Sequence, residues 1–289
     1  MSAPHDEIPR IKVARSGMRR LDDLCWGAGL SLISYGLRIG VRAQKGEMLE
    51  HLRDLLPPGC TTARSTSVDR LYSVCVEDRA VVVYADARRI ARTPDQALAL
   101  GLLESDLHLH VAQHAHDRIF VHAGAVAFNG RAIVIPGRSM TGKSTLVAAL
   151  VRAGASYYSD EYAVVDALGR VHSYPRLLSL RRGSGEPPRR CRPEEFGGKA
   201  GVRPLRVGLI VVSRYHAGHT WAPKRMPAGQ AVLALCKNTV AARSRTDEAI
   251  SSLVRLATGS LALRGTRGDA DDTAARILAT SLTVPRGVV

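Results

Sequence analysis

Four residues in one short stretch have the types and spacing that bind a nucleotide phosphate. Gly137, Gly142, Lys143 and Ser144 follow the pattern G-x-x-x-x-G-K-[ST]. The glycines let the backbone curl so that successive N–H groups point at an anion, and the positive end of the following helix faces the same point. Lys143 can reach the terminal phosphates, and the Ser144 hydroxyl can bind Mg²⁺. The expected nucleotide contacts also include the other loop residues: Arg138, Ser139, Met140, Thr141 and Thr145.

The segments on either side of this stretch support the interpretation. An apolar strand is expected over 132–135 and a helix over 145–150, as in a phosphate-binding loop. A chance glycine turn would not explain both flanks. The pattern therefore predicts a site for ATP or GTP with Mg²⁺, but it does not by itself define a reaction.

Two adjacent acids follow the expected helix. The apolar strand over 207–212, where a magnesium-binding aspartate would be sought, ends in Ser213 and Arg214. Asp160 and Glu161 lie instead one short strand after the loop, where one carboxylate can hold Mg²⁺ while its neighbour accepts a proton from an attacking hydroxyl. The alternative is a solvated acidic turn, and the loop upstream favours the functional interpretation.

The order of these motifs resembles one kinase family. H-A-G-A-V at 122–126, G-R-S-M-T-G-K-S-T at 137–145 and S-D-E at 159–161 resemble the C-terminal catalytic domain of HPr kinase/phosphorylase. They resemble still more the shorter HPr-kinase-related kinases, including those that phosphorylate a serine of lasso-peptide precursors. The resemblance covers roughly 118–280. The family's second glycine-rich signature is not recognisable in 177–185, so the resemblance extends neither to phosphorolysis nor to HPr as substrate.

The resemblance implies a role for each matching residue. Asp160 matches the candidate general base toward a serine hydroxyl, and Glu161 stands where the family's second aspartate would help with the metal. His122 matches a histidine near the transferred phosphoryl group; without the family it would be taken for a buried strand residue. Lys143 keeps its phosphate role, and Ser144 joins the two acids as a metal ligand.

Composition places the chain among soluble globular proteins. It has 289 residues, of which 45% are hydrophobic and 23% charged. No apolar run approaches the length of a transmembrane helix, and the first residues lack the apolar core of a secretory signal. The five cysteines have no metal-binding spacing, which favours reduced thiols and a cytoplasmic protein.

The formal charge of +15 favours an acidic partner. Nucleic acid is disfavoured because only 4% of the residues are aromatic and no nucleic-acid-binding signature is present. An acidic peptide or the nucleotide itself fits the charge equally well. A homo-oligomer is compatible with the sequence, which does not define the oligomeric state.

The pattern of apolar residues predicts an α/β protein with two domains. A small α/β domain is expected over 1–117 and a phosphate-binding domain over 118–289. Asn129 and Gly130 predict a tight hairpin inside the second domain, so its sheet is expected to be mixed, as in HPr kinase. Expected strands lie over 31–41, 70–78, 80–86, 119–126, 131–136, 155–158, 161–166, 170–180 and 205–212, and expected helices over 46–56, 95–115, 229–238, 246–258 and 270–281.

Several clusters keep two interpretations. The arginine-rich segment 181–205 is either a lid over phosphates or a solvated loop. Arg214 follows a buried strand and could point at the active site. The histidines of 108–116 are expected on the surface or at an interface rather than on a metal, and Asp269 is expected to cap a helix.

Together these patterns predict an ATP- and Mg²⁺-dependent kinase that transfers the γ-phosphoryl group to a serine hydroxyl of a peptide or protein, such as a ribosomal natural-product precursor. One alternative is a kinase for a small-molecule alcohol. Another is a nucleotide-dependent switch or binding protein without an acceptor.

Overall fold

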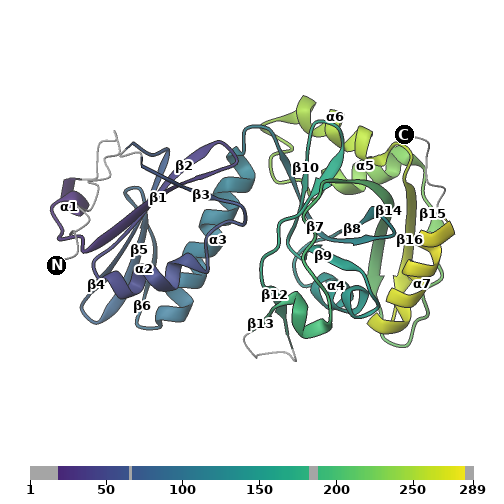
Figure 1. Ribbon diagram of the computed structural model, residues 1–289, viewed down its shortest axis with the longest axis horizontal. Coiled ribbons are helices and arrows are strands. Elements are labelled where there is room, and N and C mark those ends of the chain that lie inside the picture. The colour runs from purple at the N-terminus through teal and green to yellow at the C-terminus, as the bar shows by residue number, and fades with distance from the viewer. Residues whose placement is uncertain (1–18, 65–66, 182–187, 284–289) are drawn as a thin grey trace, which may run out of the picture. The chain divides into compact units, whose positions relative to one another are not determined.

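The computed structural model describes residues 19–64, 67–181 and 188–283 (Figure 1). The chain is an α/β protein that divides into two compact units, Met1–His116 and Asp117–Val289. This boundary lies one residue before the expected one. All five cysteines have free thiols. In the described part of the chain, no helix combines the length and apolar character needed to span a bilayer.

The N-terminal unit is a mixed sheet covered by helices. Its strands lie in the order β3-β1-β2-β4-β5-β6, with β2 and β4 parallel and the other neighbours antiparallel. The helices α2 and α3 pack on this sheet. The elements are α1 (Arg19–Asp22), β1 (Ala28–Ser34), β2 (Leu37–Ala43), α2 (Gly46–Arg53), β3 (Thr61–Ala63), β4 (Arg70–Glu77), β5 (Ala80–Ala85), β6 (Arg88–Thr93) and α3 (Gln96–His114).

One expected strand of this unit is two strands. The apolar run 31–41 contains the β1–β2 hairpin, because Tyr35 and Gly36 take φ values of 48° and 84° and reverse the chain. Two positive φ values match the turns that connect two-residue hairpins. The tyrosine concealed the turn in the sequence, since an aromatic residue is more typical of a strand.

The C-terminal unit contains the expected mixed sheet. Its strands lie in the order β11-β10-β7-β8-β14-β16-β15, and β9 pairs with β7. β14 runs parallel to both β8 and β16, whereas β7 and β8 form the antiparallel hairpin expected at Asn129 and Gly130. The strands of this sheet are β7 (Ile119–Phe128), β8 (Arg131–Pro136), β9 (Ser156–Ser159), β10 (Tyr162–Val165), β11 (Arg170–His172), β14 (Leu205–Tyr215), β15 (Lys224–Arg225) and β16 (Leu261–Arg267).

Helices cover both faces of this sheet (Figure 1). On one face α4 (Lys143–Arg152) and α7 (Ala270–Thr283) bury apolar side chains such as Leu146 and Ile277. On the other face α5 (Ala228–Cys236) and α6 (Thr246–Ala257) bury Leu235 and Leu253. The loop between the carboxyl end of the central strand β8 and the amino end of α4 contains residues 137–142.

Two segments differ from the expected ones. Residues 170–180 are not one strand, because β11 ends at His172 and a separate strand β12 (Leu178–Leu180) follows. β12 pairs with β13 (Arg189–Cys191), so ordered structure lies inside the stretch 181–205 that was expected to be a loop. The short helix η1 (Pro193–Phe196) follows β13. The lid or loop interpretation of 182–187 lies outside the described residues.

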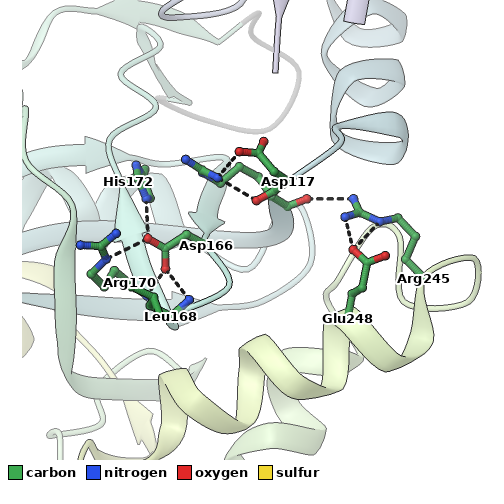
Figure 2. A network of polar contacts seen from close by, with 8 residues as sticks. Asp117, Asp166, Leu168, Arg170, His172, Arg245 and Glu248 are labelled. Atoms are coloured by element: carbon green, nitrogen blue, oxygen red, sulfur yellow. Dashed lines mark hydrogen bonds and ion pairs between the residues drawn. The ribbon is translucent and has the colours of Figure 1, made fainter. Parts of the chain in front are cut away.

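Asp166 organises the turn that leaves β10 (Figure 2). Its Oδ1 accepts hydrogen bonds from the backbone N–H groups of Leu168 and Arg170, at 3.0 and 2.9 Å. Its Oδ2 lies 2.8 Å from Arg170 Nε and 2.9 Å from His172 Nε2. The carboxylate thereby satisfies donors on both sides of the turn, which anchors the C-terminal end of β10, the strand that begins directly after Glu161.

Candidate active site

The loop between β8 and α4 has free backbone donors. Met140 and Gly142 take φ values of 68° and 77°, and Gly142 is the N-terminal cap of α4. Within the described residues, the backbone N–H groups from Arg138 to Thr145 donate no hydrogen bond. Consecutive free N–H groups at a helix N-terminus carry partial positive charge and form an anion-binding concavity. The loop therefore has the chemistry expected of a phosphate site.

A buried arginine donates hydrogen bonds to the backbone carbonyls of this loop. Arg267, at the end of β16, is 2% exposed, and its Nη2 donates to the carbonyls of Gly142 at 2.9 Å and Thr141 at 3.4 Å. Its Nε has no partner in the described structure, and burial lowers the pKa of its guanidinium. A Cβ at position 142 would lie 2.5 Å from Nη2. Sequence analysis missed both β16 and this contact.

Lys143 lies inside the loop. Its Nζ donates to the Arg138 carbonyl at 2.7 Å and lies 3.5 Å from His122 Nδ1. Burial lowers the pKa of the ammonium below its usual value of 10.5, although the nearby charges of Glu161 and Asp160 oppose that shift. A buried ammonium that donates to a neutral carbonyl gains from an incoming anion.

Asp160 is buried beside the first turn of α4. Its Oδ1 accepts from the Tyr157 hydroxyl at 3.0 Å, and its Oδ2 accepts from the backbone N–H of Ser179 at 3.1 Å. Burial raises the pKa of Asp160, while hydrogen bonds from Ser179, Ser144 and Tyr157 lower it, and the net shift is upward. This carboxylate is therefore anchored by donors and adjoins the Ser144 hydroxyl.

Glu161 is more open and pairs with His122. Its side chain is 37% exposed, and its Oε1 lies 3.0 Å from His122 Nε2. Burial acts to raise the pKa of Glu161. The hydrogen bond from His122 and the charges of His122, Arg176 and Lys143 lower this pKa by more than burial raises it, so the net shift is downward. The two neighbouring acids thus have opposite environments, which is typical of sites that divide acid and base roles.

His122 connects this acid to the loop. Its Nδ1 lies 2.7 Å from the Gly137 carbonyl, which can only accept, so Nδ1 carries a proton. Nε2 faces the Glu161 carboxylate at 3.0 Å. The two ring nitrogens therefore contact the loop on one side and Glu161 on the other.

These side chains surround one cavity of about 340 Å³. Most of the expected site residues contribute to its wall, together with Ser179 and Arg181 from the end of β12. Gly137, Arg138 and Thr141 belong to the same loop without lining the cavity. The lining residues are His122, Ser139, Met140, Gly142, Lys143, Ser144, Thr145, Asp160, Glu161, Ser179 and Arg181.

The site offers oxygen ligands to a cation. Among the described residues, no cluster of three or more His, Cys, Asp or Glu side chains could enclose a metal. Mg²⁺ needs few protein ligands, because phosphate oxygens and water complete its octahedron. The Ser144 hydroxyl and the adjoining Asp160 carboxylate form a donor set of that kind, and Glu161 adds a third oxygen group nearby.

Other candidate residues lie outside this cavity. Among the histidines of 108–116, His108 was expected on the surface but is buried in the N-terminal unit, where its Nε2 lies 3.0 Å from the Leu55 carbonyl. Asp269 caps α7 as expected, since its Oδ1 accepts from the N–H groups of Asp271 and Asp272 at 2.9 and 3.0 Å. Arg214 is exposed on β14.

Sequence analysis had no signal for two contributors to the site. Ser179 acts through its backbone N–H, which no side-chain type reveals. Arg267 comes from a strand that contains one β-branched residue, Thr266, and so has weak strand propensity. Comparison with known proteins finds neither a family model that matches this chain nor a similar curated protein.

Proposed function

We propose that this protein is an ATP- and Mg²⁺-dependent kinase of the HPr-kinase type that phosphorylates a serine hydroxyl of a peptide or protein. The observation that carries the proposal is one cavity that joins a loop of free N–H groups and Lys143 to the His122–Glu161 pair. A phosphate-binding loop alone fits many nucleotide-binding proteins. A carboxylate with a lowered pKa beside that loop adds a proton acceptor, which transfer to a hydroxyl requires.

The loop and α4 hold the phosphates in this proposal. The free N–H groups of the loop and the positive end of α4 face the β- and γ-phosphates, and Lys143 exchanges its bond to the Arg138 carbonyl for phosphate oxygens. Ser144 and Asp160 would hold Mg²⁺, which would supply positive charge to the phosphate oxygens. Arg181 lines the same cavity and is available for a further phosphate contact.

The contacts favour a division of roles between the acids that reverses the one implied by the family resemblance. Asp160 has donors on both oxygens and adjoins Ser144, so it fits a metal-holding role. Glu161 uses Oε1 for His122 and is partly exposed, so it fits the proton acceptor. In the reaction the acceptor oxygen bonds to the γ-phosphorus, the bond to the β-phosphate oxygen breaks, ADP leaves, and the hydroxyl proton passes to Glu161.

Incubation with Mg-ATP and serine-containing peptides, followed by intact-mass measurement, tests this proposal. We expect one peptide to gain a single phosphoryl group, and Lys143→Ala and Glu161→Gln variants to lose that product. Transfer only to small alcohols would support a small-molecule kinase. ATP turnover without any phosphorylated product, unchanged in Glu161→Gln, would overturn the kinase proposal in favour of a nucleotide-dependent switch.

A further inference from the structure

We infer that a second cavity, on the opposite face of the same sheet, binds an acidic segment of the acceptor peptide; this inference rests on the proposed kinase function. The cavity has a volume of about 360 Å³. Its wall contains two basic side chains and no acidic one. The lining residues are Pro136, Val212, Gln230, Leu233, Ala234, Lys237, Asn238 and Arg264.

Two residues that line this cavity are connected to the candidate active site by the backbone: Pro136 and Asn238. Pro136 directly precedes Gly137, the first residue of the phosphate loop. The Asn238 carbonyl accepts a hydrogen bond from the His122 N–H at 2.7 Å, and the Val240 N–H donates to the Phe120 carbonyl at 3.0 Å. The segment after α5 therefore follows β7 along the residues that hold His122. Among the strands that line the cavity, β8 is separated by β7 alone from β10, the strand that begins directly after Glu161.

Four cations lie around this cavity and are here called the basic face: Arg214, Lys224, Lys237 and Arg264. Strand register places Arg214, Lys224 and Arg264, whereas Lys237 lines the cavity from the end of α5. Lys224 is directly opposite Arg264 in the antiparallel pair, and Arg264 is opposite Val212 in the parallel pair. Residues in register project to the same face of a sheet, and Arg214 lies two positions after Val212 on that face. All four side chains are exposed.

The cations of the basic face form no ion pair in the described structure. The ion pairs of the described residues join acidic side chains to other arginines and to histidines. Like charges directly opposite one another destabilise a strand pair. A carboxylate that binds between Lys224 and Arg264 would relieve this repulsion, so charge complementarity favours an anionic occupant.

A peptide fits this cavity better than the nucleotide does. α4, whose N-terminus faces the phosphates, packs with Leu263 on one face of β16, whereas Arg264 projects to the other face. Leu233 on α5 is 61% exposed at the cavity wall, where it offers an apolar contact beside the charges. A peptide that carries carboxylates beside an apolar residue would match both the basic side chains and the exposed leucine of the wall.

The test uses charge reversal at Arg264 and a matched control. Arg264→Glu reverses one charge of the basic face. Arg225→Glu makes the same change in net charge at an exposed neighbour that is in register with Leu263, on the opposite face of the sheet. Two fluorescein-labelled peptides are compared, one with aspartates and one with lysines flanking a single serine. Binding is measured by fluorescence anisotropy, phosphoryl transfer by mass, and KM for ATP separately.

We expect the wild type to prefer the aspartate peptide in both binding and transfer. Arg264→Glu should weaken binding of that peptide about tenfold or more and raise its KM, while KM for ATP stays within about twofold. Arg225→Glu should behave like the wild type. Equal losses in both variants would show only the effect of net charge and overturn the inference. A rise confined to KM for ATP would place the nucleotide in this cavity and overturn it as well.

The outcomes separate this inference from the proposed function. One outcome is that the aspartate peptide binds, that Arg264→Glu abolishes this binding, and that no variant transfers phosphate. This outcome would support the peptide-binding cavity and contradict the kinase function. Equal phosphoryl transfer to the aspartate peptide and the lysine peptide would support the kinase function and contradict the peptide-binding cavity. Lys237→Glu serves as a second variant, and thermal unfolding of each variant checks that it is folded.

Discussion

His122 Nε2 lies 3.0 Å from Glu161 Oε1, and the other nitrogen of the same ring lies 2.7 Å from the Gly137 carbonyl. The histidine thus connects the more open acid to the first residue of the phosphate loop. Movement of the Gly137 carbonyl would alter one of these contacts, and movement of Glu161 would alter the other. The proposed phosphate loop and the proposed proton acceptor are therefore connected through one imidazole ring.

The two acids should respond differently to neutralisation. Glu161→Gln removes the proposed proton acceptor, so kcat should fall by roughly 10²- to 10⁴-fold with the Mg²⁺ requirement unchanged. Asp160→Asn weakens the carboxylate beside Ser144, so the Mg²⁺ concentration for half-maximal rate should rise. Steady-state kinetics over a Mg²⁺ titration distinguishes the two. Loss of kcat in Asp160→Asn at saturating Mg²⁺, with Glu161→Gln still active, would restore the division implied by the family resemblance.

Gly142→Ala should disable the phosphate loop through two separate effects. Its φ of 77° strains any other residue, and the added Cβ would lie 2.5 Å from Arg267 Nη2. Gly130 has a φ of 74° in the β7–β8 turn, with nothing within 4 Å of an added Cβ. Both substitutions should cost about 1 kcal/mol in unfolding free energy from backbone strain. Only Gly142→Ala should also abolish binding of a fluorescent ATP analogue. Equal ATP affinity in the two variants would contradict the role given to Arg267.

The sequence predicted those parts of the site that depend on local chemistry. A glycine with positive φ, a lysine and a hydroxyl at fixed spacing define the loop by themselves, and the two acids follow one short strand later. Arg267 could not be predicted, because the residues of β16 have weak strand propensity. Pairing with β14 and β15, which the sequence does not reveal, stabilises this strand. The environments of Asp160 and Glu161 were equally hidden, since burial and hydrogen bonding set them only after folding.

ATP binding should weaken at a lower pH than an ordinary lysine would allow. Burial lowers the pKa of Lys143 below 10.5, and the neutral amine no longer attracts phosphate, so kcat/KM for ATP should fall before that pH. Glu161 opposes the shift, so Glu161→Gln should lower this pKa further and move the alkaline limb to lower pH. Lys143→Arg keeps its charge and should remove the limb. Titration of ATP-analogue binding from neutral pH to about 10.5 measures it, and an unmoved limb in Glu161→Gln would contradict this coupling.

Asp166→Asn should destabilise the fold, and the effect should depend on pH. Burial acts to raise the pKa of Asp166, but hydrogen bonds from His172 and Arg170 lower it below its usual value. A lowered native pKa stabilises the fold above the unfolded pKa, about 3.9, and this stabilisation is lost as pH falls through the native value. At pH 7 the variant should lose about 1.5–3 kcal/mol in urea unfolding, because an amide cannot accept all of these hydrogen bonds. The difference should be constant down to about pH 5 and shrink only below about pH 4. Asp271→Asn, which breaks the exposed pair with Arg152, should cost less than about 1 kcal/mol. Equal losses in the two variants would show that the buried turn contributes no more than a surface ion pair.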